Sequence, residues 1–270
     1  MFAVRAAWIS AAVVLSCSSP AVAEPKYDTG VSDTEIKIGQ TTAYSGPASA
    51  WSVGSKVQVA YMRMLNEKGG INGRKINLIS LDDAYSPPKT VEQTRRLVES
   101  DGVLFMFSSL GAASNTAVHK YLNSRKIPQL FPSSGAAKWA DPQNFPWTMG
   151  WMPSFSREGF LYGKYVLASK PDAKVAIFFQ NDDYGKDFVE GFERALGPEA
   201  SKFIVSRTSY QTTDPTAESQ IVSMKASGAN ILLNASSPKF AAQAIKRGLA
   251  VVTYNARDFG RIDGLPVIEL

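Results

Sequence analysis

Residues 103–111 read VLFMFSSLG, a run of five apolar residues that passes directly into a loop of small and hydroxyl-bearing residues. A strand that is apolar on both faces is typical of a parallel sheet covered by helices on both sides. A helical pattern follows at Ala112–Arg125, and a short strand pattern follows at Gln129–Phe131. This order of strand, helix and strand predicts an open parallel α/β sheet.

The same alternation extends towards the N-terminus. Glu35–Gln40 alternates polar and apolar residues as a half-buried strand does, and Ile76–Leu81 gives a second strand pattern. Between them lies a helical pattern that ends at Gly69-Gly70, because glycine favours the C-terminus of a helix. Another helix is expected to begin at Pro87-Pro88, since proline suits the first turn.

The pattern starts again after Asp141–Pro153, a segment rich in Pro and Trp that we interpret as a crossing between lobes. Helical and strand patterns then alternate over Arg157–Ser169, Val175–Gln180, Asp187–Leu196, Phe203–Ser209, Ile221–Ala226, Ile231–Asn234 and Pro238–Lys246. We therefore predict two doubly wound parallel-sheet lobes joined by a hinge. Lobe one is expected at residues 24–147, lobe two at 148–247 and incomplete, and an atypical tail at 248–270.

The bulk composition limits the possible functions. The 270 residues are 44% hydrophobic and carry a net charge of +5, which suits a globular protein with a sizeable core. The basic residues are scattered and form no run that tracks phosphates, which argues against a nucleic-acid partner. Cys17 is the single cysteine, so no disulfide framework or thiolate metal site is expected.

Residues 1–23 have the features of a signal peptide. A basic residue precedes the apolar stretch Ala6–Leu15, which is too short to span a bilayer. Ala21-Val22-Ala23 then matches the small-residue pattern of a cleavage site. A buried N-terminal helix and lipidation of Cys17 are the alternatives. We expect cleavage after Ala23 and export of the mature chain to the periplasm.

Two serine pairs stand where a binding site is expected. In open α/β sheets, ligands bind beyond the carboxyl ends of the strands. Ser108-Ser109 and Ser133-Ser134 each lie between a strand and a helix start, where hydroxyls and unpaired N–H groups can hold a carboxylate. The alternative is that these serines simply cap helices. Trp51 belongs to the first loop of this kind, and aromatic side chains there can wall an apolar pocket.

Catalytic machinery is not evident in the sequence. His119 is the only histidine, and we expect it on the surface in the middle of a helix. No HExxH, GxSxG, P-loop or GxGxxG motif occurs. Asp82-Asp83 are adjacent in an extended segment, so their side chains should point apart rather than share a metal. Asp183 is expected to form a turn, with pairing to a ligand ammonium group as the alternative. We predict no enzymatic activity, no cofactor and no metal.

Four stretches together resemble one known family. They are IKIGQTTAYSGPAS, NEKGGINGRKINLISLDDAYSP, VLFMFSSLGAASNTAVHKYLNSRKIPQLFPSSGA and FFQNDDYGKDFVEGF, in this order between about Glu35 and Lys246. They resemble the branched-chain amino acid type, or leucine-binding protein-like, substrate-binding proteins of ABC transporters. The resemblance implies a type I periplasmic binding protein, a monomeric two-lobe clamp. It also implies a small-molecule ligand, such as an amino acid, amide or aromatic carboxylate, and a membrane permease as partner.

The resemblance also implies which residues bind the ligand. Ser108 matches the serine whose hydroxyl meets the ligand carboxylate, and Ser133, Ser134 and Gly135 match the loop whose amides meet the same group. Trp51 matches an aromatic residue of the first loop. With the neighbouring serine and two positions in lobe two added, the predicted ligand-binding residues are Trp51, Ser108, Ser109, Ser133, Ser134, Gly135, Tyr184 and Ser236.

The C-terminal tail departs from the family pattern. Members of the family continue well beyond this point, whereas the tail from Gly248 resembles the end of a PIN-domain ribonuclease toxin at Asn255–Phe259. We expect a truncated binding protein joined to a toxin remnant, with an ordinary divergent C-terminus as the alternative. A non-functional relic is also open. A metal-dependent ribonuclease would need several convergent carboxylates, and only Asp258 fits.

Overall fold

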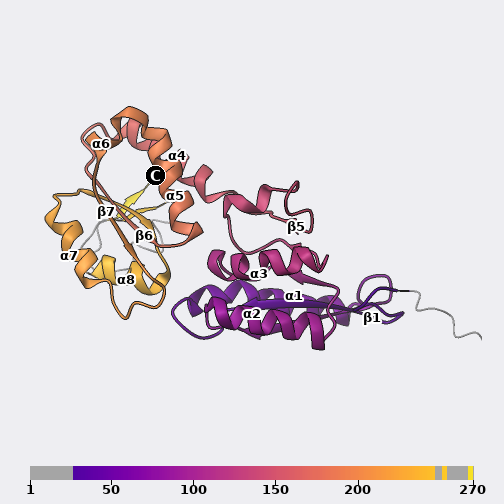
Figure 1. Ribbon diagram of the computed structural model, residues 1–270. Coiled ribbons are helices and arrows are strands. Elements are labelled where there is room, and N and C mark those ends of the chain that lie inside the picture. The colour runs from indigo at the N-terminus through magenta and orange to yellow at the C-terminus, as the bar shows by residue number, and fades with distance from the viewer. Residues whose placement is uncertain (1–26, 247–250, 254–266, 270) are drawn as a thin grey trace, which may run out of the picture.

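A computed structural model describes residues 27–246, 251–253 and 267–269 (Figure 1). It contains two five-stranded sheets, with strand orders β2-β1-β3-β4-β5 and β10-β9-β8-β6-β7, in which every strand pair is parallel. The two-lobe α/β architecture is therefore confirmed. Within the described ranges, no helix combines the length and hydropathy needed to cross a bilayer. The expected signal peptide, including Cys17, lies outside the described residues.

Lobe one forms around the first sheet. Its elements are β1 (Glu35–Thr42), η1 (Ser49–Ser52), α1 (Val53–Glu67), β2 (Lys75–Asp82), α2 (Pro87–Arg95), η2 (Arg96–Ser100), β3 (Phe105–Phe107), α3 (Ala112–Ser124), β4 (Gln129–Leu130), η3 (Ala137–Ala140) and β5 (Thr148–Met149). The proline pair opens α2 as expected. Leu97, Val103, Met106 and Leu122 belong to a buried core cluster of this lobe.

The boundary between the lobes differs from the expected one. Residues 148 and 149 were expected in lobe two, but Thr148 and Met149 pair with Gln129 and Leu130 in the sheet of lobe one. A two-residue strand has no readable periodicity, so the sequence pattern could not reveal it. The chain therefore crosses to lobe two only at residues 150–154.

Lobe two forms around the second sheet. Its elements are α4 (Phe155–Ser169), β6 (Val175–Gln180), α5 (Asp183–Leu196), η4 (Gly197–Glu199), α6 (Ala200–Phe203), β7 (Ile204–Tyr210), α7 (Glu218–Ala226), β8 (Ile231–Ala235), α8 (Pro238–Lys246), β9 (Val251–Thr253) and β10 (Val267–Glu269). Residues 175–178 of β6 are fully buried because both faces of the strand are covered. Val175 and Ile177 pack against α4 and α5, while Ala176 and Phe178 pack against α7 and α8. Figure 1 shows these two pairs of helices on opposite sides of β6.

The two described strands of the tail continue the second sheet. Val251 pairs with Leu232 of β8, and Val267 pairs with Val251, both in parallel register. A tail expected to be foreign to the lobe thus contributes strands to its sheet. Asn255–Phe259, including Asp258, lie outside the described residues, so the resemblance to a ribonuclease toxin stays a prediction.

His119 is buried, so its expected place on the surface is wrong. Only 4% of the residue is exposed. Its ring stacks on Phe145 with 3.9 Å between the ring centres and meets Trp139 edge to face at 5.1 Å. The side of α3 that carries Asn115 and Leu122 faces the protein, and position 119 shares that side. Among the described residues, the Nε2 atom of His119 has no hydrogen-bond partner.

This burial predicts acid sensitivity that depends on His119. Burial, and to a lesser extent the charge of Lys138, lowers the pKa of His119 to about 4. Because the folded-state pKa lies below the unfolded value of about 6.5, stability is complete above that pH and is lost as the pH falls towards 4. Between pH 7 and pH 5, the wild type should lose up to about 2 kcal/mol of unfolding free energy more than His119→Gln. Urea denaturation at both pH values measures the difference, and equal losses would contradict it.

Candidate functional site

A cavity of about 280 Å³ lies between the two lobes. Its residues come from the loops and turns that follow β1, β2, β3, β4 and β6, and from the crossing into α4. This is the carboxyl edge of both sheets, where ligands of open α/β folds bind. The lining residues are Trp51, Tyr85, Leu110, Gly111, Ala112, Ser133, Ser134, Met152, Phe155 and Tyr184.

Backbone hydrogen bonds hold the loops after β3 and β4 side by side. Ser133 donates its N–H to the carbonyl of Ser109 at 2.8 Å, and Gly111 donates to the carbonyl of Ser133 at 3.2 Å. Leu110 donates to the carbonyl of Thr41 at 2.9 Å, which ties both loops to β1. These contacts place the first turn of α3 next to the second serine pair.

The N-terminus of α3 opens into this cavity without a side-chain cap. Gly111 stands at the N-cap position with a φ of 98°, and no side chain accepts a hydrogen bond from the first turn. The first N–H groups of a helix have no partner within the helix, and the helix dipole adds partial positive charge there. Ala112 is 2% exposed, so these donors sit in a largely buried place. Such an end is suited to an anion such as a carboxylate.

Aromatic rings from both lobes form the walls. Trp51 of lobe one meets Tyr85 at 5.8 Å and Tyr184 of lobe two at 6.3 Å between ring centres, both edge to face. Phe155 lies 4.7 Å from Tyr184. Burial raises the pKa of Tyr85 and of Tyr184 above that of free tyrosine, so both phenols stay neutral. The walls thus suit an apolar or aromatic ligand body.

Polar contacts also join the two lobes. Gln180 of lobe two donates through Nε2 to the Tyr85 hydroxyl at 3.1 Å. Asp183 of lobe two pairs with Lys138 of lobe one, with 2.7 Å between Oδ2 and Nζ. Asp187 accepts a hydrogen bond from the backbone N–H of residue 137 at 2.7 Å, and desolvation raises its pKa. The lobes therefore already touch in this structure.

Four of the eight predicted ligand-binding residues line the cavity, namely Trp51, Ser133, Ser134 and Tyr184. The other four do not line it. Ser108 accepts a hydrogen bond at Oγ from Gln58 Nε2 at 2.9 Å, and Ser109 accepts one at Oγ from the N–H of Thr41 at 3.1 Å. Both serines are therefore engaged within lobe one.

The remaining two predicted residues do not line the cavity either. Ser236 donates its hydroxyl to Asn234 Oδ1 at 2.6 Å inside lobe two. The carbonyl of Gly135 accepts the N–H of Phe155 at 2.7 Å. A side chain at position 135 would place Cβ 2.4 Å from the carbonyl oxygen of Pro153. Gly135 thus positions an aromatic wall residue.

Sequence reasoning missed several wall residues. Tyr85, Met152 and Phe155 were not among the expected positions, although Tyr85 lies just beyond a recognised strand and Met152 lies within the recognised crossing segment. Tyr85 follows the Asp82-Asp83 pair after one intervening residue. The two carboxylates of the pair diverge: Asp82 accepts from Ser45, and Asp83 accepts from Thr90. Proximity to a strand end was the available signal for Tyr85. Among the described residues, no group of His, Cys, Asp or Glu is arranged to hold a metal ion.

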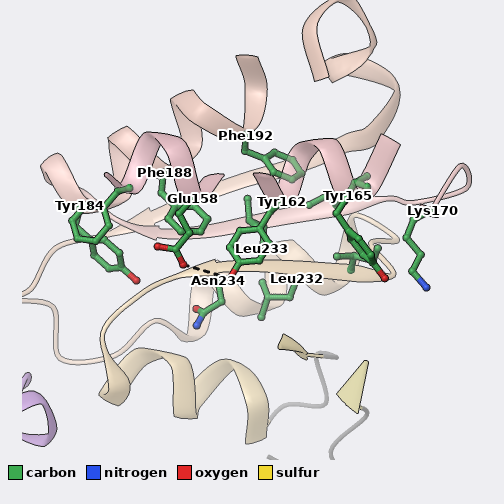
Figure 2. A pocket seen from close by; sticks show the side chains of 14 residues that line it. Glu158, Tyr162, Tyr165, Lys170, Tyr184, Phe188, Phe192, Leu232, Leu233 and Asn234 are labelled. Carbon is green, nitrogen blue, oxygen red and sulfur yellow. Dashed lines mark hydrogen bonds between the residues drawn. The ribbon is translucent and has the colours of Figure 1, made fainter. Parts of the chain in front are cut away.

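A second cavity of about 290 Å³ lies within lobe two, between α4, α5 and β8 (Figure 2). Glu158 projects into it near Asn234 and accepts a hydrogen bond from Tyr162 at 3.4 Å. Desolvation raises the pKa of Glu158. This cavity shares Phe155 and Tyr184 with the interlobe cavity, so these two rings separate one from the other.

Comparisons with known proteins agree with this fold. The family model described as "Periplasmic binding protein" matches residues 35–251. The "Leu/Ile/Val-binding protein" of Escherichia coli (strain K12) is 25% identical over 194 residues, which cover 70% of this chain and 48% of that protein. The "Leucine-specific-binding protein" of Salmonella typhimurium is 23% identical over 171 residues, covering 62% and 45%. The chain spans about half the length of the curated relatives it matches.

Solved structures share the fold. A branched-chain amino acid ABC transporter protein from Thermus thermophilus with bound valine gives a TM-score of 0.70 at 19% identity, covering 83% of this chain and 60% of that one. A solute-binding protein from Rhodopseudomonas palustris in complex with 3,4-dihydroxybenzoic acid gives 0.66 at 17%, covering 87% and 61%. The fold is that of a type I periplasmic binding protein, and the matched proteins are binding proteins rather than enzymes. Because the family model spans most of its length, this chain belongs to the periplasmic binding protein family.

Proposed function

We propose that this protein is the extracytoplasmic substrate-binding component of an ABC uptake transporter, and that it holds a small carboxylate between its lobes. One observation carries the proposal. The uncapped, buried N-terminus of α3 opens into an interlobe cavity whose aromatic walls come from both lobes. A cavity of about 280 Å³ suits one small molecule, since pockets for drug-sized ligands usually exceed about 300 Å³.

The ligand binds through two kinds of contact. Its carboxylate accepts hydrogen bonds from the first N–H groups of α3, with the hydroxyl of Ser133 beside them. Its apolar body lies against Trp51 of lobe one and Tyr184 of lobe two. Because the ligand touches both lobes, it binds the closed form more tightly and shifts the population towards it. The two lobes rotate relative to each other about the segment that connects them, residues 150–154.

Transport follows from recognition of the closed form by a membrane permease. The proteins of similar fold include ABC transporter proteins, one with bound valine and one with an aromatic acid, which supports a small carboxylate as ligand. The expected signal peptide at residues 1–23 would deliver the chain to the periplasm. We infer that the protein performs capture there and leaves translocation to the permease.

Substitution of Trp51 tests this site. We expect Trp51→Ala to weaken binding about 10-fold, because the indole supplies a wall of the cavity and an edge-to-face contact across the lobes. Isothermal titration calorimetry with leucine, valine, 4-methylpentanoate and 3,4-dihydroxybenzoate measures the affinities. Tyr61→Ala is the control, since Tyr61 is 54% exposed on α1 and does not line the cavity. If none of the four compounds gives a measurable heat of binding, the proposed function is refuted.

A further inference from the structure

We propose that the ligand of the interlobe cavity is a monocarboxylate that lacks an α-ammonium group, such as an aliphatic or aromatic acid, and not an α-amino acid. This inference rests on the proposed function, because it concerns the ligand of the same cavity. It follows from the charge of the groups that surround the cavity.

The lining of the cavity is uncharged in the part of the chain that the structure describes. None of its ten lining residues carries a formal charge, and four of them are aromatic. The ammonium group of an α-amino acid would have to leave water for this place, which is unfavourable unless an acceptor or an acid replaces the lost hydration. In an α-amino acid the ammonium group is one carbon away from the carboxylate. It would therefore also lie close to the positive end of the α3 dipole, which disfavours a positive charge.

The acidic residues near the cavity along the chain are already engaged: Asp82 accepts the Ser45 hydroxyl and Asp83 accepts the Thr90 hydroxyl, and the acids at the start of α5 are engaged as well. Asp183 pairs with Lys138 at 2.7 Å and accepts the Thr116 hydroxyl at 2.8 Å. Asp187 accepts the backbone N–H of residue 137 at 2.7 Å. Both carboxylates are therefore committed to contacts between the lobes, and a ligand ammonium would have to displace a partner from one of them.

Asp182, the N-cap of α5, is committed within its own lobe. It accepts the N–H groups of Tyr184 and Gly185 at 3.0 and 3.4 Å, and Gln180 Nε2 donates to its other oxygen at 2.6 Å. The carboxylate thus completes the start of a helix and holds the glutamine that contacts Tyr85 of lobe one. Turning it towards a ligand would break both arrangements.

Glu158 lines the lobe-two cavity and not the interlobe cavity. Figure 2 shows its carboxylate in the lobe-two cavity beside Asn234, with the Tyr162 hydroxyl as hydrogen-bond donor. Phe155 and Tyr184 stand between this cavity and the interlobe one. Glu158 is therefore not among the residues that line the interlobe cavity at the N-terminus of α3.

Matched pairs of ligands test the inference. The pairs 4-methylpentanoate with leucine and 3-phenylpropanoate with phenylalanine differ only by the α-ammonium group. Calorimetry on the purified chain at pH 7 should show each acid binding at least about 30-fold more tightly than its amino acid, equivalent to about 2 kcal/mol. Equal or tighter binding of the amino acids would overturn this inference and leave the proposed function standing. No binding by any of the four compounds would overturn the proposed function.

A variant pair tests the physical cause. Met152 lines the cavity and is 38% exposed, so a polar replacement there is tolerated without a buried charge. Met152→Glu should reduce the preference for the acid at least 5-fold relative to Met152→Gln, because only Glu offers a charge to the ammonium group. The same preference in both variants would contradict the explanation from charge.

Discussion

Replacing Gly191 with alanine will lower the free energy of unfolding by at least about 3 kcal/mol. A Cβ atom at this position of α5 would lie 1.8 Å from the backbone oxygen of Ser156 on α4. A backbone carbonyl within a helix cannot rotate away as a side chain can. The two helices must therefore move apart, and the contacts between them are lost.

The damage from Gly191→Ala should spread because α4 and α5 meet along their length. Cβ atoms at Gly159 and Gly163 would also come within 2.1 and 2.7 Å of backbone oxygens on α5. Between these glycines the helices bury Phe188 and Phe192, which pack against β6. Separation of the helices would open this core, and large losses of stability are typical of such changes.

A matched substitution separates packing from the chemistry of alanine. Gly54 lies near the start of α1, where a Cβ atom would have no other atom within 4 Å. Gly54→Ala should therefore raise stability by up to about 1 kcal/mol, since alanine is the better helix former. Urea denaturation followed by far-ultraviolet circular dichroism measures both variants. A loss below about 1 kcal/mol for Gly191→Ala would contradict the close contact of α4 and α5.

The regular elements were largely predictable because burial on both faces leaves a clear pattern. The strand Val175–Gln180 and the helix Pro238–Lys246 have the same bounds in the structure as in the sequence analysis. A parallel strand covered on both sides needs a continuous apolar run, and polar loops mark its ends. The order of these runs was sufficient to predict two α/β lobes, although the two-residue β5 carried no such signal.

The direction of side chains in the loops was not predictable in the same way. Ser108 has a φ of 50°, so the loop after β3 turns and its hydroxyl accepts a hydrogen bond from Gln58 of α1. Tyr85 likewise has a φ of 58° and reaches Gln180 of the other lobe. Such contacts join residues that lie far apart in the sequence, and no local periodicity encodes them. The position of a loop was therefore predictable, while its role in lining a cavity was not.

Asp183 shows the same limit at the boundary between the lobes. The sequence offered a turn or a ligand contact for this residue, and the structure gives it Lys138 as partner. That lysine belongs to a short helical turn of lobe one, so the pair exists only once both lobes have formed. This pairing also makes the Asp183 carboxylate unavailable to an ammonium group on the ligand, which favours a ligand without that group.

Replacing Gly111 with alanine is expected to weaken ligand binding at least about 100-fold, equivalent to about 2.7 kcal/mol. Gly111 has a φ of 98°, which side-chain-bearing residues rarely adopt, and a Cβ there would lie 2.5 Å from Cε2 of Tyr85. Tyr85 is 4% exposed and its hydroxyl is held by Gln180 across the lobes. Its ring therefore has little freedom to move aside.

Relief of this clash must disturb the site whichever group moves. If Tyr85 shifts, an aromatic wall and a contact between the lobes are lost; if the backbone shifts, the first N–H groups of α3 no longer face the cavity. Gly69→Ala is the control, because Gly69 has a φ of 103° but no atom stands within 4 Å of its Cβ position. It should cost about 1 kcal/mol of stability and leave affinity unchanged. Calorimetry with 4-methylpentanoate compares the two variants. Wild-type affinity in a folded Gly111→Ala would mean that the ligand does not use the N-terminus of α3, and the carboxylate grip would have to be sought elsewhere between the lobes.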